Sequence, residues 1–139
     1  FVIEYNVRLG DPETESLMPR IKSDLLDIFI HTVKGKLNEI TLETDPRTAA
    51  CVMLVSGGYP GEYAKGKTIS GFEKIDKSLV FHAGTDNQDG NIVTAGGRVI
   101  AVTTLDRDIK TAISTSMESA SKISFENSYF RSDIGKDLV

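Results

Sequence analysis

Apolar and polar side chains alternate with a period of two at the beginning of the chain, a pattern that predicts a β-strand over residues 1–9. The apolar members share one face of this strand: Ile3, Tyr5, Val7 and Leu9. The polar members share the other face: Glu4, Asn6 and Arg8. Because glycine and proline disfavour strands, we expect the strand to end at residues 10–12.

The pattern changes to a helical period after this strand. Asp11 followed by Pro12 is a favourable N-cap and first-turn pair, so a helix is predicted to begin there. Pro19 lacks the backbone N–H that a helix interior needs, so it is expected to interrupt or restart the helix. Apolar side chains every three or four positions then predict an amphipathic helix over residues 19–34, which Gly35 is expected to end.

The chain after residue 47 is mostly typical of β-structure. Four short apolar segments predict strands over residues 49–56, 78–83, 91–95 and 98–104. Asp89 and Gly90 favour a tight turn that closes a hairpin between the second and third of these strands. A helical period returns over residues 105–123, with Asp106 as the expected N-cap.

A polar connection over residues 37–47 separates these two parts of the chain. We expect a domain boundary there, with one domain over residues 1–40 and another over residues 48–139. The predicted fold class is α+β: a strand and a helix, followed by a mainly antiparallel sheet with a covering helix. The chain begins without Met and inside a predicted strand. We therefore expect it to be a piece of a longer protein.

Composition narrows the function classes. The 139 residues are 40% hydrophobic and 26% charged, which is ordinary for a globular protein and excludes a disordered tail or a coiled coil. The net charge of −4 disfavours binding to nucleic acid or to an anionic membrane. No apolar run approaches the ~18 residues of a membrane span. Cys51 is the one cysteine, so no disulfide forms within the chain and a reducing, cytoplasmic location is expected.

One motif resembles a nucleotide site. Residues 61–68 read GEYAKGKT, which matches the phosphate-binding pattern G-x-x-x-x-G-K-[ST]. That loop requires a helix directly after it, yet Gly71 lies in what would be the first turn. It also requires a parallel sheet, whereas the short strands here favour hairpins. We therefore interpret the segment as a surface loop.

The beginning of the chain carries more promising chemistry. Glu4 and Asn6 are two residues apart, so their side chains project from one face of the predicted strand, about 7 Å apart along it. Carboxylate and amide oxygens are ligands that Mg²⁺ takes together with phosphate oxygens, and Arg8 adds a cation to the same row. From the spacing alone, an exposed polar strand face is the favoured interpretation, with Asp11 acting only as a helix cap.

Residues 4–14 read EYNVRLGDPET, which resembles the E-x-N-x-R-x-G-D-P-E-T signature of the phosphoribosylamine–glycine ligase family. The resemblance continues in order through five further segments, residues 17–25, 56–61, 81–85, 94–99 and 129–135. It thus covers nearly the whole chain. Leu9 departs from the aromatic residue expected at its position, but it lies on the apolar face of the predicted strand.

The resemblance implies an ATP-grasp ligase of purine biosynthesis, whose substrates are ATP, glycine and 5-phosphoribosylamine. It implies that Glu4 and Asn6 bind Mg²⁺ or Mn²⁺ and that Arg8 is the catalytic arginine near the transferring phosphate. Asp11 is expected to shape the turn beneath them and to border the substrate. By analogy with related purine enzymes, Arg131 is expected to hold the ribose phosphate, with Arg98 near the active cleft.

The resemblance also implies that much of the enzyme lies upstream of Phe1, so we expect the isolated chain to lack ligase activity. Three alternatives stay open. In the first, Arg131 forms only a surface ion pair with Asp133. In the second, the parent enzyme is a different ATP-grasp carboxylase or ligase, and in the third, the chain is a non-catalytic α+β binding domain in which the polar face of residues 4–8 is merely solvated.

Overall fold

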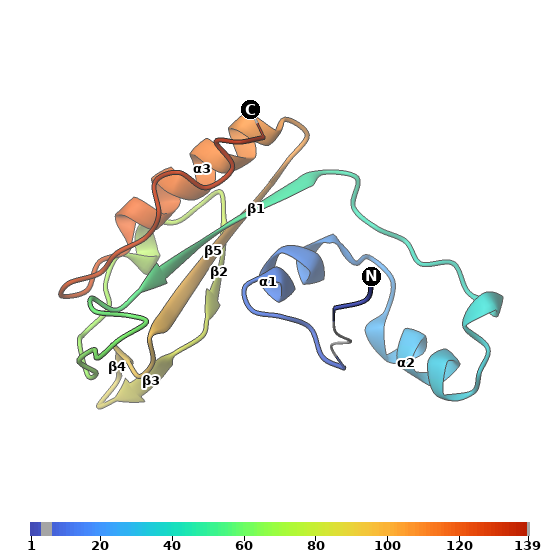
Figure 1. The fold of residues 1–139 in the computed structure, drawn as a ribbon, viewed down its shortest axis with the longest axis horizontal. Coiled ribbons are helices and arrows are strands. Elements are labelled where there is room, and N and C mark those ends of the chain that lie inside the picture. Colours follow the sequence, from blue (N-terminus) through green and yellow to red (C-terminus); the bar gives the residue numbers. More distant parts are fainter. Residues whose placement is uncertain (4–6, 139) are drawn as a thin grey trace.

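The structure is a computed structural model that describes residues 1–3 and 7–138 (Figure 1). Its centre is a three-stranded antiparallel sheet in the order β1-β5-β2. These strands are β1, Thr48–Val55, β5, Arg98–Asp106, and β2, Leu79–His82. A separate two-stranded sheet pairs β3, Thr85–Gln88, with β4, Asn91–Thr94. The predicted α+β class, with a mainly antiparallel sheet and a covering helix, is confirmed.

Helix α3, Ile109–Lys122, covers one face of the central sheet (Figure 1). The register places Val52 opposite Val102 and Leu54 opposite Ile100, and all four side chains are buried on this face. Their cluster is completed by residues from other elements: Ile69, Val99, Ala120, Ile123 and Phe125. The apolar periods of β1, β5 and α3 thus meet in one core.

Helix α1, Glu13–Leu17, lies on the opposite face of the sheet. The hydroxyl of Thr103 donates a hydrogen bond to the backbone oxygen of Glu15, at 3.0 Å. Thr103 is paired with Cys51, and alternation along a strand turns both away from the face that holds Val52 and Val102. Residues close to the signature segment are thereby attached to the middle of β5.

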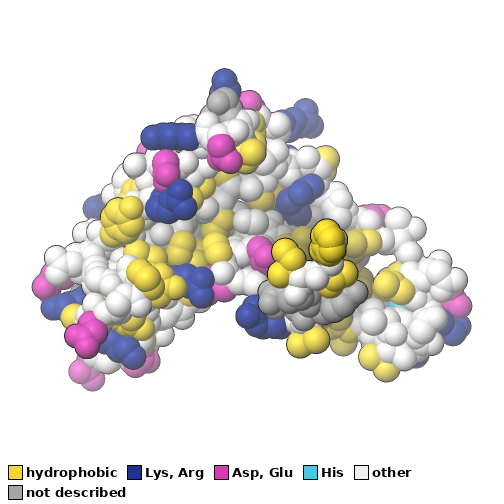
Figure 2. Space-filling model, in the orientation of Figure 1, with side chains coloured by type: hydrophobic (Ala, Val, Ile, Leu, Met, Phe, Trp, Pro, Cys, Tyr) yellow, Lys and Arg dark blue, Asp and Glu magenta, His cyan; other side chains and the backbone are white. Residues whose placement is uncertain are grey.

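Helix α2, Leu25–Val33, lies apart from the sheet beside the short turn η2, Leu37–Glu39 (Figure 1). A β-bridge between Ile21 and Thr44 joins the two ends of the segment that contains α2 and η2, residues 21–44. Several apolar side chains of this segment are exposed: Leu26, Phe29, Ile30, Val33 and Leu37. Figure 2 shows hydrophobic side chains open to the surface in this region of the molecule.

The strand predicted over residues 1–9 is wrong for the residues that can be judged. Residues 1–3 and 7–9 are not in a strand, and residues 4–6 lie outside the described residues. A strand is stable only when a neighbour satisfies its backbone N–H and C=O groups. No described strand of this chain pairs with the segment.

The helix predicted over residues 19–34 begins later than expected. Residues Met18–Arg20 form a 3-10 turn, η1, and α2 starts only after Asp24. The Asp24 carboxylate accepts hydrogen bonds from the backbone N–H groups of Leu26 and Asp27, so it fixes the start of the helix. The predicted end is confirmed, because Gly35 has φ +66 directly after the helix cap.

Two other predicted caps are wrong. α1 begins after Pro12 without any side-chain cap, and Asp11 contacts Arg98 instead. α3 begins at Ile109 with Asp108 as its cap, because β5 continues through Asp106. In both cases a tertiary or strand contact engages the residue that local sequence favoured as a cap.

The turn at Asp89 and Gly90 is confirmed, since both residues have positive φ, 51 and 83. The strands that it joins are β3 and β4 rather than the predicted pair, and β2 pairs with β5. β3 reads TDNQ and has no apolar pattern, so the sequence did not indicate it. Among the described residues, no helix is long and apolar enough to cross a membrane.

Candidate functional site

Two of the site residues expected from the sequence contact each other. The Nε of Arg98 lies 3.2 Å from Oδ2 of Asp11, and its Nη1 donates to the backbone oxygen of Asp11 at 3.0 Å. Arg98 begins β5, whereas Asp11 immediately precedes Pro12 and α1. The contact therefore attaches the end of the signature segment to the central sheet.

Close-packed glycines hold the backbone around Arg98. The N–H of Gly84 donates to the backbone oxygen of Arg98 at 2.8 Å, and a Cβ on Gly84 would clash with that oxygen and with Gly96. Ser56 holds the two glycines that precede Arg98: its N–H donates to the backbone oxygen of Gly97 at 2.8 Å, and its hydroxyl donates to the backbone oxygen of Gly96 at 2.9 Å. Only glycine permits backbones to approach this closely.

A largely apolar cavity of about 290 Å³ lies at this end of the sheet. Its lining residues come from three segments that are distant in sequence: Pro12, Met53, Val55, Tyr59, Tyr129, Phe130, Arg131 and Ile134. Pro12 links the cavity to Asp11, and Tyr59 links it to Gly97, because a Cβ on Gly97 would clash with the Tyr59 ring. The cavity and the Asp11–Arg98 pair therefore form one local region, which we call the Arg98 site.

Arg131, the residue expected to hold a phosphate, lines this cavity. Its guanidinium makes two hydrogen bonds to the Asp133 carboxylate, Nε to Oδ1 at 2.9 Å and Nη2 to Oδ2 at 2.8 Å. These bonds lower the pKa of Asp133 and raise that of Arg131. The surface ion pair that the sequence suggested is thus present, and it lies at the cavity.

The residues expected to bind the metal cannot be placed. Glu4 and Asn6 lie outside the described residues, and Arg8 is exposed, with Nη1 donating to the backbone oxygen of Leu9 at 3.0 Å. Within residues 1–3 and 7–138, no group of three or more His, Cys, Asp or Glu side chains could hold a metal ion. Asp11 and Arg98 are brought together, whereas in the described part of the chain Arg8 forms no hydrogen bond or ion pair with either of them.

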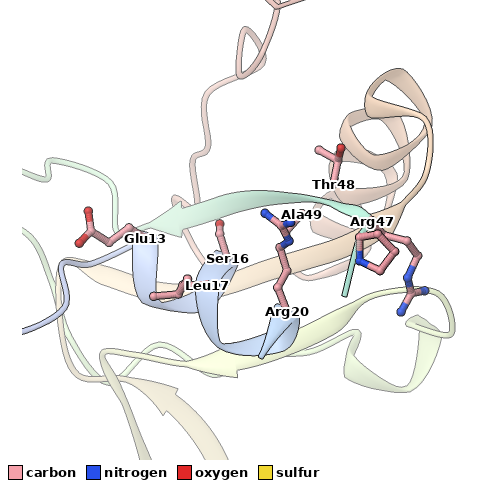
Figure 3. A pocket seen from close by; sticks show the side chains of 8 residues that line it. Glu13, Ser16, Leu17, Arg20, Arg47, Thr48 and Ala49 are labelled. Carbon is pink, nitrogen blue, oxygen red and sulfur yellow. The ribbon is translucent and has the colours of Figure 1, made fainter. Parts of the chain in front are cut away.

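A second pocket, of about 310 Å³, lies between α1, η1 and the start of β1 (Figure 3). Ser16 and Arg20 extend into it toward β1, whereas Glu13 and Arg47 point away at its two ends (Figure 3). The Nε of Arg20 donates to the backbone oxygen of Asp45 at 3.2 Å. Sequence reasoning missed this pocket, although its Arg20 lies within residues 17–25 of the family resemblance.

The interpretation of residues 61–68 as a surface loop agrees with the structure. The N–H of Gly66 donates to the backbone oxygen of Thr94, and Thr68 forms a bridge with Val93. The Nζ of Lys67 lies 2.6 Å from a Glu126 carboxylate oxygen. The N–H of Gly66 and the ammonium of Lys67, which a phosphate-binding loop would offer to its ligand, are thus already engaged.

The geometry of the Arg98 site suits a small ligand with both an apolar or ring-shaped part and an anionic group. Apolar walls with aromatic rings would enclose the first, and the guanidinium of Arg131, which is paired with Asp133, would contact the second. Cys51 is not part of this chemistry: burial raises the pKa of its thiol, which disfavours the nucleophilic thiolate.

Comparison with known proteins gives a consistent result. A family model described as "Phosphoribosylglycinamide synthetase, C domain" matches residues 49–137. A phosphoribosylamine–glycine ligase from Caldanaerobacter subterraneus subsp. tengcongensis is 46% identical over 133 residues, which cover 96% of this chain and 32% of the relative. One from Vibrio parahaemolyticus is 46% identical over 136 residues, with the same coverage.

A crystal structure of phosphoribosylamine–glycine ligase from Thermotoga maritima superposes with a TM-score of 0.76 at 34% identity, covering 96% of this chain and 33% of that one. The chain thus spans about a third of the length of the relatives it matches. The family predicted from residues 4–14 and the motifs that follow them is confirmed. This chain belongs to the phosphoribosylglycinamide synthetase C-domain family.

Proposed function

We propose that the chain acts as the C-terminal part of a phosphoribosylamine–glycine ligase, which uses ATP to join glycine to 5-phosphoribosylamine in purine biosynthesis. The observation that carries this proposal is the contact between Asp11 and Arg98. It joins the segment with the family signature, residues 4–14, to the segment that matches the C-domain family, residues 49–137. The 46% identity over 96% of the chain supports it. The single cysteine and this biosynthetic role favour a cytoplasmic location.

The proposed reaction has two steps. A glycine carboxylate oxygen attacks the γ-phosphorus of ATP, which forms glycyl phosphate and releases ADP. The amine nitrogen of phosphoribosylamine then attacks the carbonyl carbon, a C–N bond forms, phosphate leaves, and the nitrogen loses a proton. No protein nucleophile is required, so the protein contributes mainly positioning and electrostatic stabilisation.

The signature residues fit the first step by their chemistry. Glu4 and Asn6 offer a carboxylate and an amide oxygen, the donor set that would hold Mg²⁺ or Mn²⁺, and such an ion neutralises phosphate charge when bound. Arg8 is exposed, and among the described residues its hydrogen bond is to the backbone oxygen of its neighbour Leu9. In this proposal its guanidinium orients the transferring phosphoryl group and the glycine carboxylate.

The Arg98 site fits the second step. Arg131 at the cavity wall would hold the ribose phosphate, and the aromatic and apolar walls would enclose the sugar ring. Asp11 and Arg98 border the same region next to Pro12. Arg98 uses Nε and Nη1 for Asp11, and among the described residues no hydrogen bond engages its Nη2, which in this proposal contacts a substrate oxygen.

The two-part organisation expected from the sequence stays a proposal, with residues 1–40 completing an ATP-grasp domain and residues 48–139 forming the C domain. The family match that begins at residue 49 supports it. The separation of α2 from the central sheet also supports it (Figure 1). The 139-residue chain alone is expected to be inactive.

The role of Arg131 is tested in a full-length ligase that carries this chain. Arg131→Ala is expected to raise the KM for phosphoribosylamine about tenfold or more and to spare the KM for ATP, because a charge-assisted contact to one substrate is lost. The matched variant is Asp133→Ala, which also breaks the Arg131–Asp133 pair but keeps the arginine. Equal effects of both variants, or no effect of Arg131→Ala, would overturn the assignment.

A further inference from the structure

The ring of Tyr59 packs directly against Gly97, since any Cβ at that position would clash with its Cδ2 and Cε2 atoms. The turn that carries Tyr59 is fixed independently. The N–H of Tyr59 donates to the backbone oxygen of Ser56 at 3.0 Å, and Ser56 itself holds Gly96 and Gly97. Tyr63 meets the ring edge-on at a centroid distance of 6.2 Å. Tyr59 is therefore seated on the backbone directly before Arg98.

The next residue in this chain of contacts is Arg98, whose guanidinium holds both the carboxylate and the backbone oxygen of Asp11. Its side chain is 41% exposed, so packing on the guanidinium alone does not fix its position. What fixes it is the backbone on either side: Gly97 beneath the Tyr59 ring and the bond from Gly84 to the oxygen of Arg98. Removing the ring would free one of these two supports.

We propose that Tyr59 is a positioning residue of the acceptor-substrate site, which acts through Gly97 to hold Arg98 on Asp11 beside the cavity. This inference rests on the proposed function, because it assigns the cavity to the acceptor substrate. The part of Tyr59 that matters is its ring face. Its hydroxyl makes no hydrogen bond among the contacts of the described residues, so phenylalanine is expected to replace it.

Steady-state kinetics of a full-length ligase that carries this chain test the inference. Tyr59→Ala and Gly97→Ala are each expected to raise the KM for phosphoribosylamine about tenfold, with the KM for ATP unchanged, because a misplaced guanidinium weakens one substrate contact. Tyr59→Phe should restore the wild-type KM. Gly90→Ala is the glycine control, since nothing lies within 4 Å of its Cβ position; its φ of +83 adds backbone strain that Gly97 lacks, so any effect of strain alone would appear in this variant.

A double variant separates this route from others. Tyr59→Ala combined with Arg98→Ala should raise the KM by less than the product of the two single effects, because the main effect of Tyr59 passes through the Arg98 guanidinium while a smaller one comes from its place in the cavity wall. The inference is overturned if the effects of Tyr59→Ala and Arg98→Ala multiply or if Tyr59→Phe is as impaired as Tyr59→Ala. A lower kcat with an unchanged KM in Tyr59→Ala also overturns the inference, because that result indicates only that a smaller fraction of the enzyme is folded.

A second measurement applies even if wild-type enzyme shows no ligase activity, which would refute the proposed function. The Nε–H signal of Arg98 is followed by ¹⁵N NMR in the same protein. We expect the signal to shift or to exchange faster with water in Tyr59→Ala and Gly97→Ala, and to be retained in Tyr59→Phe and Gly90→Ala. An unchanged signal in Tyr59→Ala would overturn the positioning role, whatever the reaction.

Discussion

Arg98 holds Asp11 across 87 positions of sequence, with Nε 3.2 Å from Oδ2 and Nη1 3.0 Å from the backbone oxygen. The two side chains are 41% and 43% exposed. Exposed ion pairs contribute little to stability, because solvent screens them and two long side chains must be ordered. This pair is therefore expected to contribute little to the free energy of unfolding.

The first prediction follows from this exposure. Arg98→Ala should lower the free energy of unfolding by no more than about 1 kcal/mol, measured by urea denaturation. Lys36→Ala, which removes an exposed pair with Glu39 on η2, provides the comparison and should have an effect of similar size. A loss above about 2 kcal/mol for Arg98→Ala alone would contradict the prediction and indicate a structural role.

The second prediction concerns pH. Hydrogen bonds from the Arg47 side chain and backbone hold the pKa of Asp45 well below its usual value of 3.8. A carboxyl whose pKa is lowered by folding stabilises the protein at every pH above its unfolded pKa, and the effect is lost as the pH falls toward the folded pKa. Asp45→Asn should therefore unfold more easily than wild type at pH 7, and the difference should shrink below about pH 4. A difference that is independent of pH from 7 to 3 would contradict this.

The third prediction concerns Gly71, which has φ +98 and whose Cβ, if present, would clash with the backbone oxygen of Lys122 at the end of α3. Gly71→Ala should lower the free energy of unfolding by about 2 kcal/mol or more, because strain in φ adds to displacement of the helix end. Gly90→Ala has the same strain but open space, so it should cost only about 1 kcal/mol. The midpoints of thermal unfolding compare the two variants, and Gly71→Ala should have the lower midpoint. Equal midpoints for Gly71→Ala and Gly90→Ala would refute the steric argument.

The fourth prediction concerns the exposed apolar face of α2. Phe29 is 59% exposed and Val33 is 88% exposed. Replacing both by serine should reduce self-association of the 139-residue chain, measured by light scattering after size exclusion, because such surface associates in water. The midpoint of thermal unfolding should change little, since neither side chain is in the core. Unchanged association together with a lower midpoint would show that these side chains pack internally.

The elements that sequence predicted well are those whose pattern matches their final environment. β1 and β5 are continuous apolar segments because they lie at the centre of the molecule between α3 and α1. β3 could not be predicted, because its residues TDNQ are polar and only pairing with β4 makes them a strand. The segment over residues 1–9 failed for the converse reason, since its alternating pattern has no partner strand in the described chain.

The candidate site was predictable only in part. The pair of Arg131 and Asp133 is two residues apart and could be anticipated from spacing. The contact between Arg98 and Asp11 could not, because only the folded chain brings residues so distant in sequence together. The cavity depends on three separate segments, including those that carry Tyr59 and Tyr129, that no local pattern connects. The metal-ligand roles of Glu4 and Asn6 stay predictions that rest on the family signature.

The most direct test of the ligase assignment is ADP release by a full-length enzyme that carries this chain, supplied with ATP, Mg²⁺ and glycine, with and without phosphoribosylamine. We expect release to require both substrates and to collapse in a Glu4→Gln variant, because one charged oxygen ligand of the phosphate-bound metal is lost. Release that is absent with glycine but present with another acid and amine would contradict the assignment and indicate a different ATP-grasp ligase.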